Sequence, residues 1–248
     1  MKAAAVTAVL WLLAQALAAQ GPFNDLLGSG TSQQVLKAVQ AGADVRQSDR
    51  AGVTPLMIAA ARNPNAGVIM VLLAAGARVD ERDWIGMTPL MYAAASNPHP
   101  EVTRALLAAG ASVDDRDSLG ASAMDYAAEQ NRPEVVSALI AGGGNADRAD
   151  PAGMTPLMHA AQRNPDPGVV RVLLDAGARI DARNVTGMTP LLFAAGFTTN
   201  PEVLLALLTD GADPHAVGPG GVTAARLAAG NEHLRGTTAA GALLRVSE

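Results

Sequence analysis

Side chains that could perform chemistry are sparse in this chain of 248 residues. There is no cysteine, which excludes disulfides, thiolate nucleophiles and zinc–sulfur sites. An enzyme needs nucleophiles, bases or metal ligands that converge on one point. The candidates for such a role are the four histidines, His99, His159, His215 and His233.

Two further patterns suggest ligand binding but lack the required context. Gly142-Gly143-Gly144 resembles a phosphate-binding loop, yet no strand is predicted before it and no Gly-Lys-Thr follows. Asp80-Glu81 and Asp114-Asp115 suggest calcium, but they lack the spacing of a loop that supplies six oxygens. We interpret the glycines as a helix stop and the acidic pairs as solvated edges, so no cofactor is expected.

The elements that carry these residues follow from an internal repeat. Aligning the Thr-Pro-Leu-Met runs puts six positions in register at spacings of 34, 34, 33, 34 and 34 residues: Thr54, Thr88, Ser122, Thr155, Thr189 and Thr223. A second landmark always precedes the next Thr or Ser by 22 residues: Ala66, Pro100, Pro133, Pro167 and Pro201. The one missing residue therefore lies in the turn before Pro133, and a deletion confined to a turn is typical of folded repeats.

Each repeat is predicted to form a helix, a turn, a second helix and an extended finger. The Thr can cap the first helix, because the following proline suits the first helical position. In the second helix both Leu106 and Leu107 are predicted to be buried. Its caps are predicted at Asn65, His99, Asp166 and Asn200, and its left-handed ends at Gly76, Gly110, Gly177 and Gly211.

These residues resemble the ankyrin repeat. The family pattern G-x-T-P-L-H-x-A-A, V-V-x-L-L and G-A-D-x-N is matched by residues 86–94, by Leu106-Leu107 and by Gly110-Ala111. Methionine or leucine replaces the motif histidine at Met57, Met91, Met158 and Leu192. Asn-Pro pairs such as Asn63-Pro64 fill a longer turn between the helices. The resemblance implies an all-α ankyrin-repeat solenoid, with extended β-like fingers, that binds another protein and is not an enzyme.

Seven units are expected after an N-terminal signal. The N-terminal capping repeat is 19–51, with a helix at Ser32–Gln40 capped by Thr31 and Gln34. Five repeats follow at 52–85, 86–119, 120–152, 153–186 and 187–220. A C-terminal capping repeat covers 221–248, with a helix at Thr237–Val246. Atypical terminal units cover the exposed faces at the ends of a solenoid.

Residues 1–18 have the features of a Sec-type signal peptide. Lys2 is followed by the apolar run Ala3–Ala14, and Ala16-Leu17-Ala18 gives the small-x-small pattern of a cleavage site. Cleavage there would leave a periplasmic or secreted protein without a membrane anchor. The net charge of −5 and the scattered basic residues do not indicate nucleic-acid binding. The mature protein is expected to be a monomer.

The resemblance also implies where a partner would bind. In ankyrin proteins, contacts come mainly from the finger tips and the exposed side of the first helix. At the finger tips these positions are Trp84, Ile85 and Leu119, and after the finger glycine they are Met87, Met154 and Met188. On the first helices they are Arg62, Arg163 and Phe197 near the ends, and Tyr92, Tyr126 and Phe193 one step earlier.

Two questions stay open at this point. Tyr92, Tyr126 and Phe193 form a ladder with Ile58 and His159, and this ladder could instead be half-buried packing between repeats. The four histidines fall at four different positions of the repeat, so stacking cannot gather them into a site.

The first functional hypothesis is an envelope scaffold that holds, inhibits or protects a partner. The alternative is an effector delivered to a host cell that imitates eukaryotic ankyrin proteins.

Overall fold

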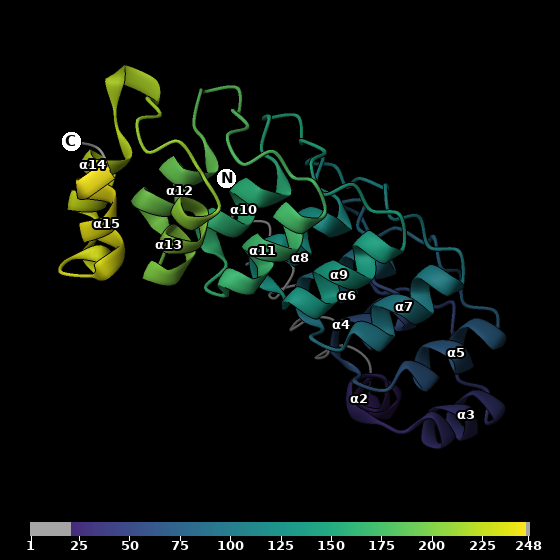
Figure 1. Ribbon diagram of the computed structural model, residues 1–248. Coiled ribbons are helices and arrows are strands. Elements are labelled where there is room, and N and C mark those ends of the chain that lie inside the picture. The colour runs from purple at the N-terminus through teal and green to yellow at the C-terminus, as the bar shows by residue number, and fades with distance from the viewer. Residues whose placement is uncertain (1–20, 247–248) are drawn as a thin grey trace. The chain divides into compact units, whose positions relative to one another are not determined.

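Helices in pairs make up the computed structural model, which describes residues 21–246 (Figure 1). The predicted signal at 1–18 lies outside these residues. The pairs are α2 (Gly21–Ser29) with α3 (Ser32–Gln40), α4 (Pro55–Arg62) with α5 (Ala66–Ala74), α6 (Pro89–Ser96) with α7 (Pro100–Ala108), α8 (Ala123–Gln130) with α9 (Pro133–Ala141), α10 (Pro156–Arg163) with α11 (Pro167–Asp175), α12 (Pro190–Phe197) with α13 (Pro201–Thr209), and α14 (Ala224–Gly230) with α15 (Thr238–Val246).

Within residues 21–246 the secondary structure is thus all-α, apart from two short 3-10 turns, η1 (Pro219–Gly221) and η2 (Glu232–Leu234), and an isolated bridge between Val217 and Thr223. The turn between α8 and α9 has two residues, whereas the turns from α4 to α5 and from α6 to α7 have three. The deletion before Pro133 therefore lies where the repeat spacing placed it.

Threonine caps start the first helices as predicted. The Thr54 and Thr88 hydroxyls each accept a hydrogen bond from the backbone nitrogen three residues on, at 3.3 Å. In the N-terminal unit, Thr31 N donates to Gln34 Oε1 at 2.8 Å and Gln34 N donates to the Thr31 hydroxyl, which confirms the capping box. The predicted bounds of Ser32–Gln40 are those of α3, while α15 begins at Thr238, one residue later than expected.

Caps of the second helices are confirmed in three of four cases. Asn65, Asp166 and Asn200 each accept a hydrogen bond from the backbone nitrogen two residues on. The prediction for His99 was wrong, because its side chain makes no cap hydrogen bond. An imidazole is bulkier than the short oxygen-bearing side chains that cap helices well. At the other end of these helices, Gly76, Gly110, Gly177 and Gly211 all have φ between 90° and 96°.

Burial differs between the two helices of a pair. In α4 every residue from Pro55 to Ala61 is buried, because its alanines allow neighbouring helices to approach on several sides. The second helix α7 buries only a stripe that includes Val102 and Leu106. Leu107 is half-buried, contrary to expectation, since it lies about 100° round the helix from Leu106. There it faces the chain at Gly142, where an added Cβ would be 2.7 Å from Leu107 Cδ1.

Buried asparagines in the turns between helices connect successive repeats. Asn97 Nδ2 donates to Ala60 O at 2.9 Å and to Asn63 O at 2.8 Å, both in the preceding repeat. The same double contact recurs one repeat away from Asn63, Asn164 and Asn231. The Asn-Pro turns that distinguish this sequence therefore supply hydrogen bonds between repeats.

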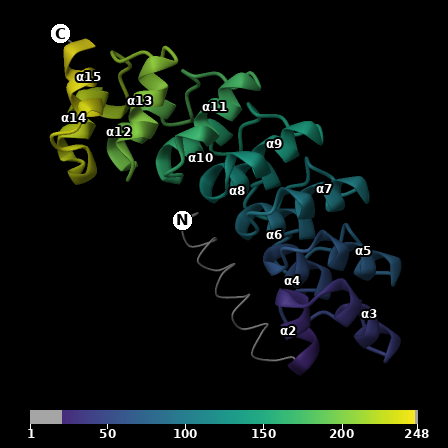
Figure 2. The same ribbon diagram turned by 60° about the horizontal axis from the view of Figure 1, so that its bottom comes forward.

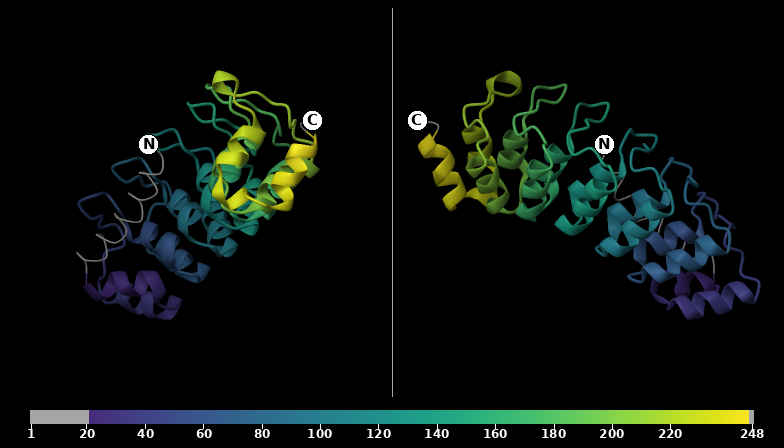
Figure 3. Two further views of the ribbon diagram at one scale, coloured as in Figure 1. Left: turned by 90° about the vertical axis from the view of Figure 1, so that its left-hand side faces the viewer. Right: turned by 45° about the vertical axis from the view of Figure 1, so that its right-hand side comes forward.

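The chain divides into two compact units. Unit 1 runs to Tyr126 and includes Ala141–Gly144, and unit 2 comprises Ala127–Ile140 and residues from Asn145 onward. In unit 1, α4 lies between α2 and α6, and α5 lies between α3 and α7 (Figure 2). In unit 2, α12 lies between α10 and α14, and α13 lies between α11 and α15. The fingers of each unit are long loops on one side of its helix pairs (Figure 3).

Candidate binding surface

An Asp or Asn side chain at the base of each of five fingers fixes the shape of the finger. Asp83 Oδ1 accepts hydrogen bonds from Ile85 N at 3.0 Å and from Met87 N at 2.8 Å. Gly86, with φ 84°, closes the tight turn between them. Asp49, Asp117, Asp150 and Asn184 bind two backbone nitrogens in the same way. The tip residues thus project from a rigid loop.

Neighbouring fingers of unit 1 are also tied to each other. Trp84 N donates to Ala51 O at 3.0 Å, and Ser118 N donates to Ile85 O at 2.8 Å. The guanidinium of Arg82 donates to Gly86 O and to Arg116 O, each at 2.9 Å. These bonds order the tips before any partner arrives, which lowers the entropic cost of association.

Large apolar side chains are exposed at these tips. Trp84 is 67% exposed and Leu119 is 44% exposed, while Ile85 between them in sequence is half-buried. We call Trp84, Ile85 and Leu119 the finger-tip patch. In unit 2, Val185 occupies the tip position equivalent to Trp84 and is also exposed. The repeat register identifies Val185-Thr186 as a finger-tip pair, although Val185 was not among the predicted contacts.

The structure buries several other candidate residues. Met87, Tyr92, Tyr126 and Phe193 are all buried, so they are not on the surface that a partner would meet. Met154 and Met188 are half-buried. For the ladder residues Tyr92, Tyr126 and Phe193, the alternative interpretation of internal packing fits better than partner contact does.

Hydrogen bonds explain why the ladder faces inward. Tyr92 Oη donates to Asp83 Oδ2 at 2.8 Å, and Tyr126 Oη donates to Asp117 Oδ2 at 2.5 Å. These tyrosines therefore secure the finger-base carboxylates. Burial raises the pKa of Asp83 above its ordinary value, although its hydrogen bonds with Tyr92, Met87 and Ile85 oppose this. Burial, reinforced by the nearby Asp83, raises the pKa of Tyr92 well above 10.0.

The histidines occupy unrelated environments. His159 takes the ladder position in unit 2, where its Nε2 lies 3.7 Å from Asp150 Oδ2 in a buried pair. His99, His215 and His233 are exposed, in a turn, a finger and the C-terminal cap. Across residues 21–246 no three metal-binding side chains lie together. Over the same residues, no helix has the length and apolar character to cross a membrane.

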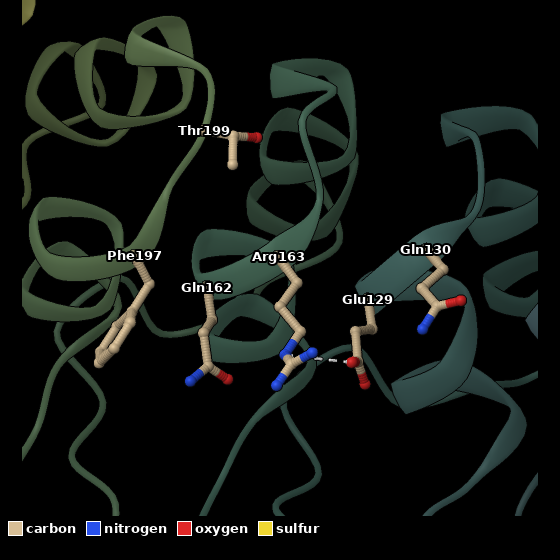
Figure 4. A pocket seen from close by; sticks show the side chains of 6 residues that line it. All are labelled: Glu129, Gln130, Gln162, Arg163, Phe197 and Thr199. Carbon is tan, nitrogen blue, oxygen red and sulfur yellow. Dashed lines mark ion pairs between the residues drawn. The ribbon is translucent and has the colours of Figure 1, made fainter. Parts of the chain in front are cut away.

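A groove of about 500 Å³ lies at the ends of three first helices in unit 2 (Figure 4). Its lining residues are Glu129, Gln130, Gln162, Arg163, Phe197 and Thr199, and we call it the three-helix groove. It brings together two predicted contacts, Arg163 and Phe197. Sequence reasoning missed Glu129, although it is the neighbour of Gln130, which occupies the position equivalent to Arg163 in the preceding repeat. Arg62, the equivalent of Arg163 in unit 1, is exposed beside Gly28.

Comparisons with known proteins agree with this architecture. A family model described as "Ankyrin repeats (3 copies)" matches residues 26–117 and 124–218. The human ASB11 ankyrin repeat domain is 26% identical, with a TM-score of 0.77, over 92% of this chain and 98% of that one. The ankyrin repeat domain of Bcl-3, described as a unique member of the IkappaB protein family, is 25% identical, with a TM-score of 0.64. The match covers 92% of this chain and 99% of that one. No curated protein matches the chain.

Proposed function

Because this chain belongs to the ankyrin-repeat family, whose domains are generally scaffolds for protein–protein interaction, we propose that it is a non-catalytic scaffold of the bacterial envelope. It binds a partner protein through its finger tips and the exposed ends of its first helices, and it holds, inhibits or protects that partner. The envelope location rests on the Sec-type features of residues 1–18.

The finger-tip patch is the observation that carries the proposal. Trp84 leaves most of its indole in water although its backbone is held by the neighbouring finger. Burying a large apolar side chain contributes about 1.5–3 kcal/mol, and tryptophan is enriched among residues that dominate binding energy. A fixed loop that presents an indole and a leucine has the properties expected of an anchor for a partner.

Crosslinking in intact cells of the source bacterium, followed by mass spectrometry, tests this function. The full chain is compared with Trp84→Ala and with Met70→Ala as a matched control. Met70 is a large apolar side chain with 57% exposure, but it lies on the second helix α5 of the same unit. We expect Trp84→Ala to weaken capture of one specific partner about tenfold or more, while Met70→Ala leaves it unchanged.

Thermal unfolding of the same variants supplies the stability control. Trp84→Ala should change the melting temperature little, because the indole is mostly in solvent. Equal capture by the wild type and Trp84→Ala would contradict a contact role for the finger-tip patch. Capture that depends on neither the finger tips nor the first-helix ends would refute the proposed function.

A further inference from the structure

The three-helix groove contains a buried acid that holds a partly exposed guanidinium. The Glu129 side chain is only 6% exposed, and its Oε1 lies 3.3 Å from Arg163 Nε. This ion pair compensates the charge of the buried carboxylate and positions Arg163 from its Nε side. Among residues 21–246, none binds the two terminal nitrogens of Arg163, and its side chain is 40% exposed. That edge of a guanidinium suits bidentate binding of a carboxylate.

Phe197 supplies an apolar platform in the same groove. Its side chain is 53% exposed, and its ring centroid lies 6.2 Å from that of Phe193 at an interplanar angle of 35°. Phe193 is buried, so the pair holds the exposed ring in a defined place. Figure 4 shows Phe197, Gln162, Arg163, Glu129 and Gln130 along one side of the helix ends. The glutamine amides can both donate and accept hydrogen bonds, as a peptide main chain requires.

The groove crosses three successive repeats. Its residues come from α8, α10, α12 and, for Thr199, the turn after α12. Asn164 at the end of α10 bonds to Ala128 O and Asn131 O at the end of α8. Packed helices lie about 8–10 Å apart, so three of them span roughly 20 Å. An extended chain rises about 3.3 Å per residue, which gives a segment of about six residues.

We propose that the three-helix groove binds an extended segment of a partner protein, with an Asp or Glu side chain on Arg163 and an apolar side chain against Phe197. This inference rests on the proposed protein-binding function and names the chemistry of the partner. Arg163 lies on α10, the middle helix of the three, so a segment that fills the whole groove meets it with an internal side chain rather than with a terminal carboxylate. Residues two apart in an extended segment face the same side. The acidic and the apolar residue of the segment are therefore expected to have one residue between them.

The net charge of the whole chain, −5, does not prevent this recognition. Charges separated by more than about 10 Å are largely screened at 0.1 M salt. The acid of the partner therefore responds mainly to the guanidinium that it contacts. Glu129 partly offsets that charge, so binding also depends on the apolar contact with Phe197.

Synthetic peptides test the groove without knowledge of the partner. Eight-residue probes, acetylated and amidated at their ends, carry Glu-x-Leu or Leu-x-Glu in a Gly/Ser background. Matched probes replace Glu by Gln, replace Leu by Ala, or carry a free terminal carboxylate in place of the Glu side chain. Binding is followed by NMR shifts of the full folded chain labelled with ¹⁵N. We expect the Glu/Leu probes to shift resonances of 129–130, 162–163 and 197–199, and to bind about tenfold more tightly than the Gln probes.

Protein variants locate the contact. Arg163→Gln and Phe197→Ala should each weaken the Glu/Leu probes about tenfold, with circular dichroism unchanged. Arg104→Gln is the matched control, because Arg104 is likewise an exposed arginine paired with a glutamate, Glu101 at 3.2 Å, but it lies on the second helix α7. It should have no effect.

Equal binding of Glu and Gln probes, shifts outside the groove, or no binding up to about 1 mM would overturn the proposal. Preference for the free terminal carboxylate would overturn the choice of an internal acid. If the peptides fail while Trp84→Ala still abolishes partner capture, the groove assignment falls and the scaffold function stands. If the peptides bind but crosslinking finds no partner, the peptide-binding chemistry of the groove stands and the scaffold function falls.

Discussion

Tyr92 and Asp83 are a buried, hydrogen-bonded pair that supports an exposed finger tip. The tyrosine hydroxyl donates to a carboxylate whose other oxygen holds the backbone of a finger tip. Trp84 is the residue next to that carboxylate in sequence, and it is exposed. The exposed contact and its buried support therefore belong to one loop.

This pair predicts an alkaline loss of stability. The pKa of Tyr92 is raised above 10.0 in the folded state, so the unfolded chain loses this proton first as pH rises. The stability from Tyr92 is present in full below pH 10 and is lost above it, by up to about 1.4 kcal/mol per pH unit. Urea unfolding at pH 8 and pH 11 should show a smaller difference for Tyr92→Phe than for the wild type. An identical alkaline loss in both proteins would argue against this assignment.

Asn97 tests the hydrogen bonds between repeats. Its amide binds two carbonyls of the preceding repeat and is 1% exposed, so Asn97→Ala leaves buried acceptors without this donor. We expect a loss of about 2–3 kcal/mol in the free energy of unfolding. Asn65→Ala, in the equivalent turn of the preceding repeat, removes an exposed cap and should cost about 0.5–1 kcal/mol. Comparable urea midpoints for the two variants would contradict the structural role of Asn97.

At the scale of elements, the two helices of each pair have different tasks. First helices such as α4 are buried nearly all round and carry candidate contacts only at their ends, as Arg163 and Phe197 do in α10 and α12. Second helices bury one stripe and leave the rest more exposed, which is why Leu106 is buried and Leu107 is half-buried. The proposed contacts therefore lie at fingers and helix ends.

Position along a unit should decide how much a buried leucine contributes. Leu207 in α13 and Leu243 in α15 are both fully buried. Helix α13 packs against α11, α12 and α15, whereas the terminal helix α15 packs against α13 and α14. Truncation of a buried leucine costs about 2–5 kcal/mol, and Leu207→Ala should lie nearer the upper end because it loosens more interfaces. Denaturant midpoints that fall equally, or further for Leu243→Ala, would count against nearest-neighbour stacking.

At the scale of the whole molecule, the repeat supplies both fold and binding surface. Each interval of about 34 residues adds one helix pair and one finger, so residues at the same position of successive repeats lie side by side within a unit. By this rule the finger that carries Trp84 and Ile85 lies beside the finger that carries Leu119, and the end of α8 with Glu129 lies beside the end of α10 with Arg163. Binding surface is thus made by repetition rather than by a single pocket.

The proposed export concerns the whole chain and can be tested directly. Residues 1–18 predict cleavage after Ala18, so the mature protein should begin at Ala19. N-terminal sequencing of protein from the envelope fraction checks this expectation. An intact Met1 terminus in a cytoplasmic fraction would reject the envelope location. Recovery from host cells would instead favour the effector alternative.

The sequence by itself determined the elements, because their signals are local. Threonine caps, the proline that follows them and the glycine stops each act within a few residues, and the period of the repeat set the seven units. The starts of the first helices, the capping box and the short turn before Pro133 were therefore predictable.

Only the tertiary structure decided which side chains are exposed. Trp84 and Tyr92 were mapped to the same face, yet the indole is in solvent and the phenol is inside, bonded to Asp83. The pairing of Glu129 with Arg163 likewise depends on the stacking of one repeat on the next. Burial and ion pairs arise between residues distant in sequence, so no local pattern contains them.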